Sequence, residues 1–369
     1  MSALEDYLRD LIAHEGPLTL ERFMGLALGH PTMGYYITRD PFGVAGDFTT
    51  APEISQMFGE LIGLWAAETW AAMGAPAHLH LVELGPGRGT LMKDALRAAS
   101  VAPAFANVIE AHLVETSPVL AQAQKQTLAG TQIPVSWHSA IETIPPGPAI
   151  FIANEFFDAL PVRHYVKDAG VWRERLVGLD AHGRFAFGLS REAEVSIRVD
   201  APQSAVIEVG AIGQRIMTTL ATRLVEQGGA ALIIDYGYVE TALGETLQAL
   251  RGHQFVDPLE SPGEADLTTH VDFAALARAA RAAGAQAHGP ITQGALLTAL
   301  GIFERARALL RRADAAQAAG IEAALARLVS DQAGIEVEGG VVDGMGELFK
   351  AICVTAPGMA PPAGFEDRP

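Results

Sequence analysis

Residues 81–90 read LVELGPGRGT, and this stretch decides the class of fold. An apolar run stops at the first glycine and a helical pattern follows the last one, which predicts a strand, a tight turn and a helix. Glycines at such a turn let a ligand approach the backbone closely, and the N-terminus of the helix favours anionic groups. The G-x-G-x-G spacing differs from the G-x-G-x-x-G fingerprint of dinucleotide-binding proteins, which disfavours a dehydrogenase.

Strand-length apolar runs alternate with helical patterns on the C-terminal side of this turn. Helical patterns over residues 89–100 and 117–130 separate strand patterns over residues 107–117, 133–139 and 148–161. Such alternation over short loops indicates a parallel sheet with helices on both faces. We therefore expect a doubly wound α/β fold.

Two stretches interrupt this alternation. Residues 162–203 hold strand-like runs separated by DAG and AHG, and residues 294–330 form a helical pattern rich in Ala and Arg. Residues 1–77 are mostly helical in spacing, with one long helix expected over residues 51–74. The expected parts are an N-terminal helical cap (1–77), the first part of the core (78–161), an antiparallel β-hairpin insertion (162–203), the second part of the core (204–293), a helical insertion (294–333) and the final core strand with the tail (334–369).

The composition excludes several classes of protein. Of the 369 residues, 49% are hydrophobic and 19% are charged, so the chain can bury a large core and is not globally disordered. The mean hydropathy is +0.21, yet no apolar stretch approaches the ~18 residues of a membrane-spanning helix. A net charge of −17 argues against a nucleic-acid partner. The same charge is compatible with a basic protein partner or a cationic ligand.

The N-terminal residues resemble neither a signal peptide nor a transit peptide. Since Met1 is present, we expect a bacterial cytoplasmic protein, with the mitochondrial matrix as the alternative if a presequence has been removed. The single cysteine, Cys353, lies in an apolar pattern over residues 348–356. It excludes an internal disulfide and a cysteine-cluster metal site, and we expect a buried, inert thiol.

Two acidic residues follow successive predicted strands. Glu83 stands two residues before the first glycine of the turn, which resembles motif I of class I S-adenosylmethionine (SAM) methyltransferases. There it would help hold the cationic amino end of the methionine moiety. Glu115 ends the next strand, where an acid can accept hydrogen bonds from both ribose hydroxyls. Each acid alone is more often a surface charge, and NAD would use the same ribose acid, but together they favour a nucleoside cofactor.

The third strand is followed by Trp137, His138 and Ser139, where an adenine would lie. The alternative is ordinary packing for Trp137 and a surface loop for His138. No second ligand stands at a useful spacing from His138, so we expect no metal site.

The fourth strand is followed by Asn154, Glu155 and Asp158. Ligands of open parallel sheets bind beyond the carboxyl ends of the strands, so these side chains should meet the methyl acceptor. Carboxylates suit a cationic acceptor such as a guanidinium, which they can hold in a bidentate manner. The alternative for Asp158 is that it caps the N-terminus of a helix.

Residues 30–60 form an unusually long, glycine- and aromatic-rich connection that holds Asp47 and Glu53. Long ordered loops are often functional. The alternative is a simple helix start, in which Thr50 and Glu53 form a capping box; both interpretations can hold at once.

Six blocks of the sequence together resemble the MidA family of class I SAM-dependent methyltransferases. They extend from residue 30 to residue 350, and the first block has no common counterpart in other methyltransferases. The blocks are HPTMGYY…GDFTTAPEISQMFGE (30–60), VELGPGRGTLMKD (82–94), ANEFFDALPV (153–162), LIIDYGY (232–238), DLTTHVDFAAL (266–276) and GMGELFK (344–350).

The resemblance implies a seven-stranded, Rossmann-like methyltransferase sheet and a SAM-dependent protein-arginine N-methyltransferase. Mitochondrial members form symmetric dimethylarginine on a core subunit of NADH:ubiquinone oxidoreductase early in its assembly. The expected partner is therefore a protein with an exposed arginine, in particular a respiratory complex I subunit. The oligomeric state is left open by the sequence, with a homodimer as one alternative.

The family motifs carry over onto residues of this chain. Motif I falls on Glu83, Gly85, Pro86, Gly87 and Gly89, the ribose acid on Glu115, the Gly-Asp-Phe block on Gly46, Asp47 and Phe48, and the fourth-strand block on Asn154, Glu155 and Asp158. We expect the motif I residues, Gly46, Asp47, Thr49, Glu115, His138, Ser139 and Asn154 to bind the cofactor. From position we infer catalytic roles for Asp47, Asn154, Glu155 and Asp158, with Asp47 and Glu155 on the acceptor guanidinium.

Two other functions compete with this interpretation. The first is SAM-dependent methylation of a small molecule, which a deep closed pocket would favour and an open acidic groove would not. The second is an assembly chaperone that holds a respiratory subunit and uses SAM weakly or not at all. The intact motif I argues against complete loss of cofactor binding.

Overall fold

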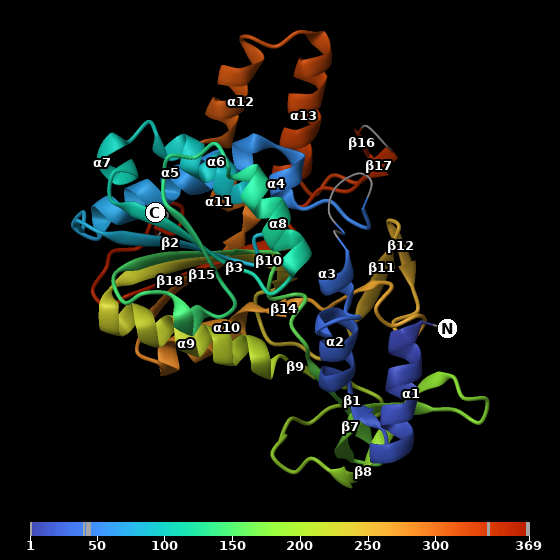
Figure 1. Ribbon diagram of the computed structural model, residues 1–369. Helices are drawn as coiled ribbons and strands as arrows, with labels where there is room; N and C mark the ends of the chain where they lie inside the picture. The colour runs from blue at the N-terminus through green and yellow to red at the C-terminus, as the bar shows by residue number, and fades with distance from the viewer. Residues whose placement is uncertain (1, 40, 42–45, 338–339, 367–369) are drawn as a thin grey trace.

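The computed structural model describes residues 2–39, 41, 46–337 and 340–366. Its centre is a mixed eight-stranded sheet in which seven strands follow the order β15-β18-β10-β5-β2-β3-β4, while β14 pairs with β10 (Figure 1). β18 runs antiparallel to both of its neighbours, and the other pairs are parallel. The α/β expectation is thus confirmed. The strands are β2 (Leu79–Leu84), β3 (Ile109–Val114), β4 (Val135–His138), β5 (Ala149–Asn154), β10 (Gly229–Tyr238), β14 (Val271–Asp272), β15 (Gln286–Thr292) and β18 (Phe349–Thr355).

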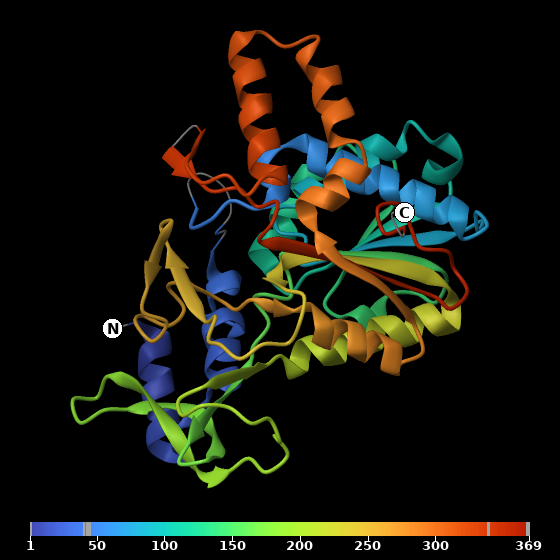
Figure 2. The same ribbon diagram turned by 180° about the vertical axis from the view of Figure 1, so that it is seen from behind.

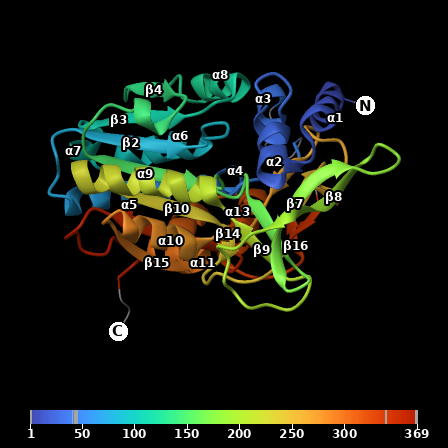
Figure 3. The ribbon, with the colours of Figure 1, turned by 90° about the horizontal axis from the view of Figure 1, so that it is seen from below.

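Helices cover both faces of this sheet (Figures 2 and 3). α5 (Gln56–Ala72), α6 (Thr90–Ala99) and α11 (Gln293–Ala299) contribute to one hydrophobic core, and α9 (Ala211–Gln227) and α10 (Phe273–Ala282) contribute to the other. Every residue of β5 is buried, as expected for a strand covered on both sides. α8 (Pro118–Thr127) follows β3. Cys353 of β18 is fully buried, as expected from the sequence.

The single helix expected over residues 51–74 is wrong. The chain forms α4 (Ala51–Ile54) and α5, with Ser55 between them in an extended conformation. The Ser55 hydroxyl accepts a hydrogen bond from the N–H of Met57 at 3.2 Å, which caps the second helix. α5 then packs closely on α6, where a Cβ on Gly63 would lie 2.6 Å from the Cα of Ala95. Part of the N-terminal region is therefore built into the sheet's own core.

A second sheet, which is antiparallel throughout, lies to one side of the main sheet (Figure 1). Its path is β1-β7-β6-β9, with β8 beside β7, so the expected antiparallel pairing is confirmed but involves more than a hairpin. α1 (Ala3–Glu15) and α2 (Leu20–Gly29) pack on it around a third core that includes Leu8, Phe23 and Val177. The strands are β1 (Leu18–Thr19), β6 (Arg163–Asp168), β7 (Val171–Leu179), β8 (Phe185–Ala193) and β9 (Val206–Val209).

Shorter elements complete the molecule. A three-stranded sheet, which the sequence did not predict, joins β11 (Gln248–Arg251), β12 (Gln254–Val256) and β13 (Asp266–Thr268). α12 (Ile302–Leu310) and α13 (Ala315–Val329) stand away from the main sheet (Figure 2). The remaining elements are α3 (Tyr35–Thr38), α7 (Pro103–Ala106), the 3₁₀ turn Ile141–Thr143, β16 (Ile335–Val337) and β17 (Gly340–Val342). Within the described ranges, no helix combines the length and apolarity needed to cross a membrane.

Candidate active site

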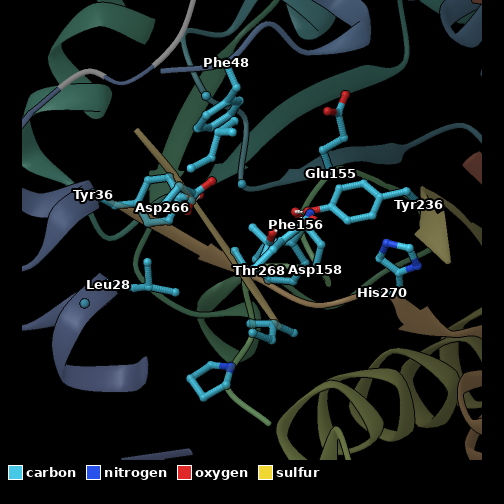
Figure 4. Close-up of a pocket in the computed structure, with 18 of the residues that line it drawn as sticks. Leu28, Tyr36, Phe48, Glu155, Phe156, Asp158, Tyr236, Asp266, Thr268 and His270 are labelled. Atoms are coloured by element: carbon cyan, nitrogen blue, oxygen red, sulfur yellow. Dashed lines mark hydrogen bonds between the residues drawn. The ribbon is translucent and has the colours of Figure 1, made fainter. Parts of the chain in front are cut away.

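A cavity of about 610 Å³ lies where the carboxyl ends of the central strands meet the smaller elements. Residues that follow β2, β3 and β5 line it from the main sheet, and residues of α2, α3 and the β11–β13 sheet line it from the other side (Figure 4). This is the position at which open α/β sheets bind ligands. The expected residues that line it are Thr49, Gly85, Gly87, Glu115, Glu155 and Asp158.

The motif I loop depends on glycine for its conformation. Gly85, Gly87 and Gly89 have φ of +61°, +52° and +81°, in the left-handed region that favours glycine. A Cβ on Gly85 would also lie 2.7 Å from the Phe156 ring. The loop therefore brings bare backbone to the cavity wall, where a ligand can lie against it.

Glu83, at the end of β2, is 3% exposed and lines a small recess beside motif I together with Pro86 and Asn154. Its Oε2 has no hydrogen-bond partner among the described residues. Burial, with a smaller contribution from the charge of Glu115, raises the pKa of Glu83 to about 8. A buried carboxyl oxygen without a partner is costly unless a cation or donor joins it. The site therefore fits the ammonium group of SAM.

Glu115 is held by a network that the sequence did not reveal. Its Oε1 accepts from the N–H of Ser117 at 2.7 Å, and its Oε2 accepts from the Gln124 amide at 3.0 Å. The same Gln124 amide donates to the carbonyl of Gly87 at 2.8 Å, and its oxygen accepts from the Trp137 indole. Gln124 is completely buried and joins motif I to the ribose acid. Its only sequence signal is a polar residue at an inward position of α8.

Neither His138 nor Ser139 is among the described residues that line the cavity. The His138 ring instead ends a row of imidazoles: its Nε2 lies 2.9 Å from Nδ1 of His112, whose Nε2 lies 2.9 Å from Nδ1 of His80. The other ring nitrogen of His138 contacts the hydroxyl of Thr143 at 3.0 Å. The contact of Trp137 with Gln124 is the link between this strand end and motif I.

Glu155, in the loop after β5, lines the cavity (Figure 4) and also the recess that holds Glu83. Its φ of +50° is rare for a residue with a side chain. Its Oε1 accepts from the N–H of Ala51 at 2.8 Å and from the Asn154 amide at 2.9 Å. Burial, and to a smaller extent the charge of Asp158, raises the pKa of Glu155 to about 7. Asn154 keeps a buried Oδ1 that lacks a partner within the described ranges.

Asp235 of β10 holds this loop in place. One of its oxygens accepts from the N–H groups of Phe156, Phe157 and Asp158 at 3.1, 2.9 and 3.2 Å, and the other accepts from the N–H of Tyr236 at 3.0 Å. Asp235 is completely buried. The sequence block LIIDYGY contains it but did not suggest this role.

Asp158 is 6% exposed and lines the cavity. Its Oδ2 accepts from the Tyr236 hydroxyl at 2.8 Å, whereas Oδ1 lacks a partner in the described part of the chain. Burial raises the pKa of Asp158 to about 6. Capping of a helix by Asp158 is wrong, because a turn and then β6 follow it.

Asp47 and Gly46 are not among the described residues that line the cavity. The Asp47 carboxylate accepts from the Tyr35 hydroxyl at 2.6 Å and from the N–H of Gly252 at 2.6 Å. It thus joins the connection after α3 to the β11–β12 turn. Phe48 and Thr49, the next residues, do line the cavity.

The expected capping box at α4 is absent from the described residues, since the Thr50 side chain makes no capping hydrogen bond. The Glu53 carboxylate instead accepts from the hydroxyl of Thr90, at the start of α6. Arg88 lies 3.9 Å from the same carboxylate. Glu53 therefore joins the 30–60 block to motif I.

Comparison with known proteins identifies the family. The family described as "Putative S-adenosyl-L-methionine-dependent methyltransferase" matches residues 61–291. The chain is 41% identical to the protein arginine methyltransferase NDUFAF7, mitochondrial, of Danio rerio, over 84% of this chain and 79% of that protein. It is 38% identical to the protein of the same name from Homo sapiens, over 82% and 74%. A crystal structure from Burkholderia thailandensis with bound S-adenosyl-homocysteine has a TM-score of 0.87 at 28% identity, covering 99% of this chain and 95% of that one.

Proposed function

The chain belongs to the MidA family of SAM-dependent methyltransferases, and we propose that it methylates arginine side chains of a protein that is assembled into respiratory complex I. The observation that carries this proposal is the cavity beside motif I, where Glu155, Asp158 and Asp266 bring three buried or half-buried carboxyls together. Such a cavity suits a cationic acceptor. The relatives are named as mitochondrial protein arginine methyltransferases, which supports an arginine acceptor and a mitochondrial setting. We further propose that this chain works in a bacterial cytoplasm or a mitochondrial matrix.

We assign the cofactor to the residues around motif I. Gly85 and Gly87 present backbone to it, Glu83 offers an unpaired oxygen to its ammonium group, and Glu115 offers oxygens to the ribose. The assignment also includes Asn154, which lines the same recess as Glu83. Its amide oxygen has no hydrogen-bond partner among the described residues. When bound, SAM supplies an electrophilic methyl group on a cationic sulfur.

Replacing Glu83 by glutamine should weaken binding of S-adenosyl-homocysteine by about 10- to 100-fold, because a neutral amide replaces the partner of the ammonium group. The same variant should bind 5′-methylthioadenosine, which lacks the amino-acid moiety, as tightly as the unchanged protein does. Calorimetric titration with both ligands tests this. Equal weakening for the two ligands would contradict the assignment of Glu83.

The acceptor side of the site needs a group that takes a proton. An arginine is fully protonated in water, so one of its nitrogens loses a proton when it is methylated. Glu155 lines the cavity, and its raised pKa of about 7 suits proton transfer near neutral pH. We propose that Glu155 orients the guanidinium and receives this proton, with Asn154 holding Glu155 through its amide.

Glu155→Gln should keep the affinity for S-adenosyl-homocysteine within about twofold and lower methyl transfer by about 100-fold or more. Because the raised pKa leaves Glu155 protonated below pH 7, kcat/KM of the unchanged enzyme should fall as the pH drops through about 7. The variant should lose this dependence, while replacement of the exposed Glu142 by glutamine should preserve it. Full activity in Glu155→Gln would remove Glu155 from the mechanism.

The proposed function is tested by transfer of isotopically labelled methyl groups from SAM into lysate proteins of a strain that lacks this enzyme. Mass spectrometry then locates the labelled residue. Label on an arginine of a complex I subunit is the expected result. Measurable SAM binding without any labelled protein would contradict it and favour a small-molecule acceptor or a chaperone.

A further inference from the structure

Two buried aspartates reach the same cavity from different sheets. Asp158 follows β5 of the main sheet, and Asp266 begins β13 of the three-stranded sheet. They are 6% and 5% exposed. The Tyr236 hydroxyl donates to Asp158 at 2.8 Å, and the Tyr36 hydroxyl donates to Asp266 at 2.8 Å. Figure 4 shows both pairs at the cavity wall.

The charge of Asp158 acts on the Asp266 carboxyl. Burial, followed by the charge of Asp158, raises the pKa of Asp266 to about 8, and burial raises the pKa of Asp158 to about 6. At neutral pH the pair therefore carries less than its full negative charge, and Asp266 is mostly protonated. A bound cation would allow both to ionise. Arg327 also lines the cavity, but its charge acts on Glu155, where it partly offsets the rise in pKa caused by burial.

The hydrogen bonds leave the two aspartates as acceptors. Each tyrosine has one hydroxyl proton and donates it to an aspartate, so the pair offers hydrogen-bond acceptors to the cavity. Asp158 lines the cavity, and its Oδ1 is buried without a partner among the described residues. A guanidinium is planar and carries only donors, five in an arginine, whereas an ammonium carries three around one centre. Leu28, Phe48 and Phe156 form an apolar part of the cavity wall, against which the aliphatic part of an arginine side chain can pack (Figure 4).

We propose that Asp158 and Asp266, each fixed by its tyrosine, form the subsite that holds the guanidinium of the acceptor arginine. This inference rests on the proposed function and gives the guanidinium a different partner from the one expected from the sequence. Asp47 was expected there, but its carboxylate is bound to Tyr35 and Gly252. Asp266 replaces it, and Glu155 keeps the role proposed above.

A direct test uses crystals of the complex with S-adenosyl-homocysteine, soaked with ethylguanidinium or with ethylammonium. We expect ethylguanidinium between Asp158 and Asp266 and weaker or no occupancy for ethylammonium. In solution, ethylguanidinium should raise the thermal unfolding temperature of the same complex more than ethylammonium does. Ethylguanidinium bound elsewhere, or no difference between the two cations in both experiments, would overturn the inference.

Variants separate this subsite from the cofactor site. Asp266→Asn and Asp158→Asn should bind S-adenosyl-homocysteine within about twofold of the unchanged protein, lose the response to ethylguanidinium and transfer methyl groups at least about 50-fold more slowly. Glu264→Gln is the control, because it removes a half-exposed carboxyl, paired with Arg39, two positions from Asp266. Tyr36→Phe keeps the ring but removes the hydroxyl that donates to Asp266, so it should lower methyl transfer by an intermediate amount. This variant tests the subsite even if one of the asparagine variants fails to fold.

The outcomes distinguish the two proposals. If the unchanged enzyme methylates arginine and Asp266→Asn does so equally well, the subsite is wrong and the proposed function stands. If no arginine is labelled but ethylguanidinium still binds between the two aspartates, the proposed function fails and the subsite remains as a cation site.

Discussion

Replacing Gly87 by valine should abolish measurable binding of S-adenosyl-homocysteine, a loss of at least about 100-fold. Gly87 has φ of +52°, which a β-branched residue adopts only with strain of about 1–3 kcal/mol. The new side chain would also stand at the cavity wall that Gly87 lines. The carbonyl of Gly87 accepts from Gln124, so a shifted loop would disturb the ribose acid as well.

Calorimetric titration and thermal unfolding of the same sample measure both effects. Gly188→Val is the matched control, because Gly188 lies in β8, where an added Cβ meets nothing within 4 Å. The control should keep the affinity of the unchanged protein. Affinity of Gly87→Val within about fivefold of the unchanged protein would contradict the placement of the cofactor over motif I.

Replacing Asp235 by alanine should have the largest effect on stability. Three N–H groups of the loop after β5 lose their shared acceptor in a buried position, which we expect to lower the free energy of unfolding by about 3–4 kcal/mol. Glu155 and Asp158 lie on this loop, so methyl transfer should be lost even in the molecules that remain folded.

Denaturant unfolding monitored by circular dichroism gives the free energy. Asp180→Ala is the control: this aspartate also accepts from two backbone N–H groups, those of His182 and Arg184, but in the turn between β7 and β8. The control should cost less than about 1 kcal/mol, because water can satisfy exposed groups. A similar small cost for Asp235→Ala would show that the loop does not depend on Asp235.

Much of the sheet could be predicted from local sequence. The apolar runs that became β2, β3, β4 and β5 are long enough to identify, and the glycines between β2 and α6 have left-handed backbones that only a turn would need. The break at Ser55 was not predicted, because residues 51–74 continue the helical pattern across it. The three-stranded sheet was missed because its strands are only three or four residues long.

The site was predicted in part. Glu155 and Asp158 could be placed at the cavity because they directly follow a buried strand, and such strands end at one edge of the sheet. Asp47 looked like their partner from its glycine- and aromatic-rich surroundings, but its carboxylate joins two loops. Gln124 and Asp235 could not be recognised, since a buried polar side chain gains its role only from the groups that surround it.

The sequence by itself determined the α/β class, the glycine loop, the acids at the ends of neighbouring strands and the family, because these depend on the order of residues along short stretches. Only the tertiary structure decided which distant side chains share the cavity. Asp158 lies in the loop after β5 of the main sheet and Asp266 lies in β13 of the three-stranded sheet, while Tyr36 reaches Asp266 from α3. Such contacts follow from how the sheets pack together, which the pattern within any single segment does not contain.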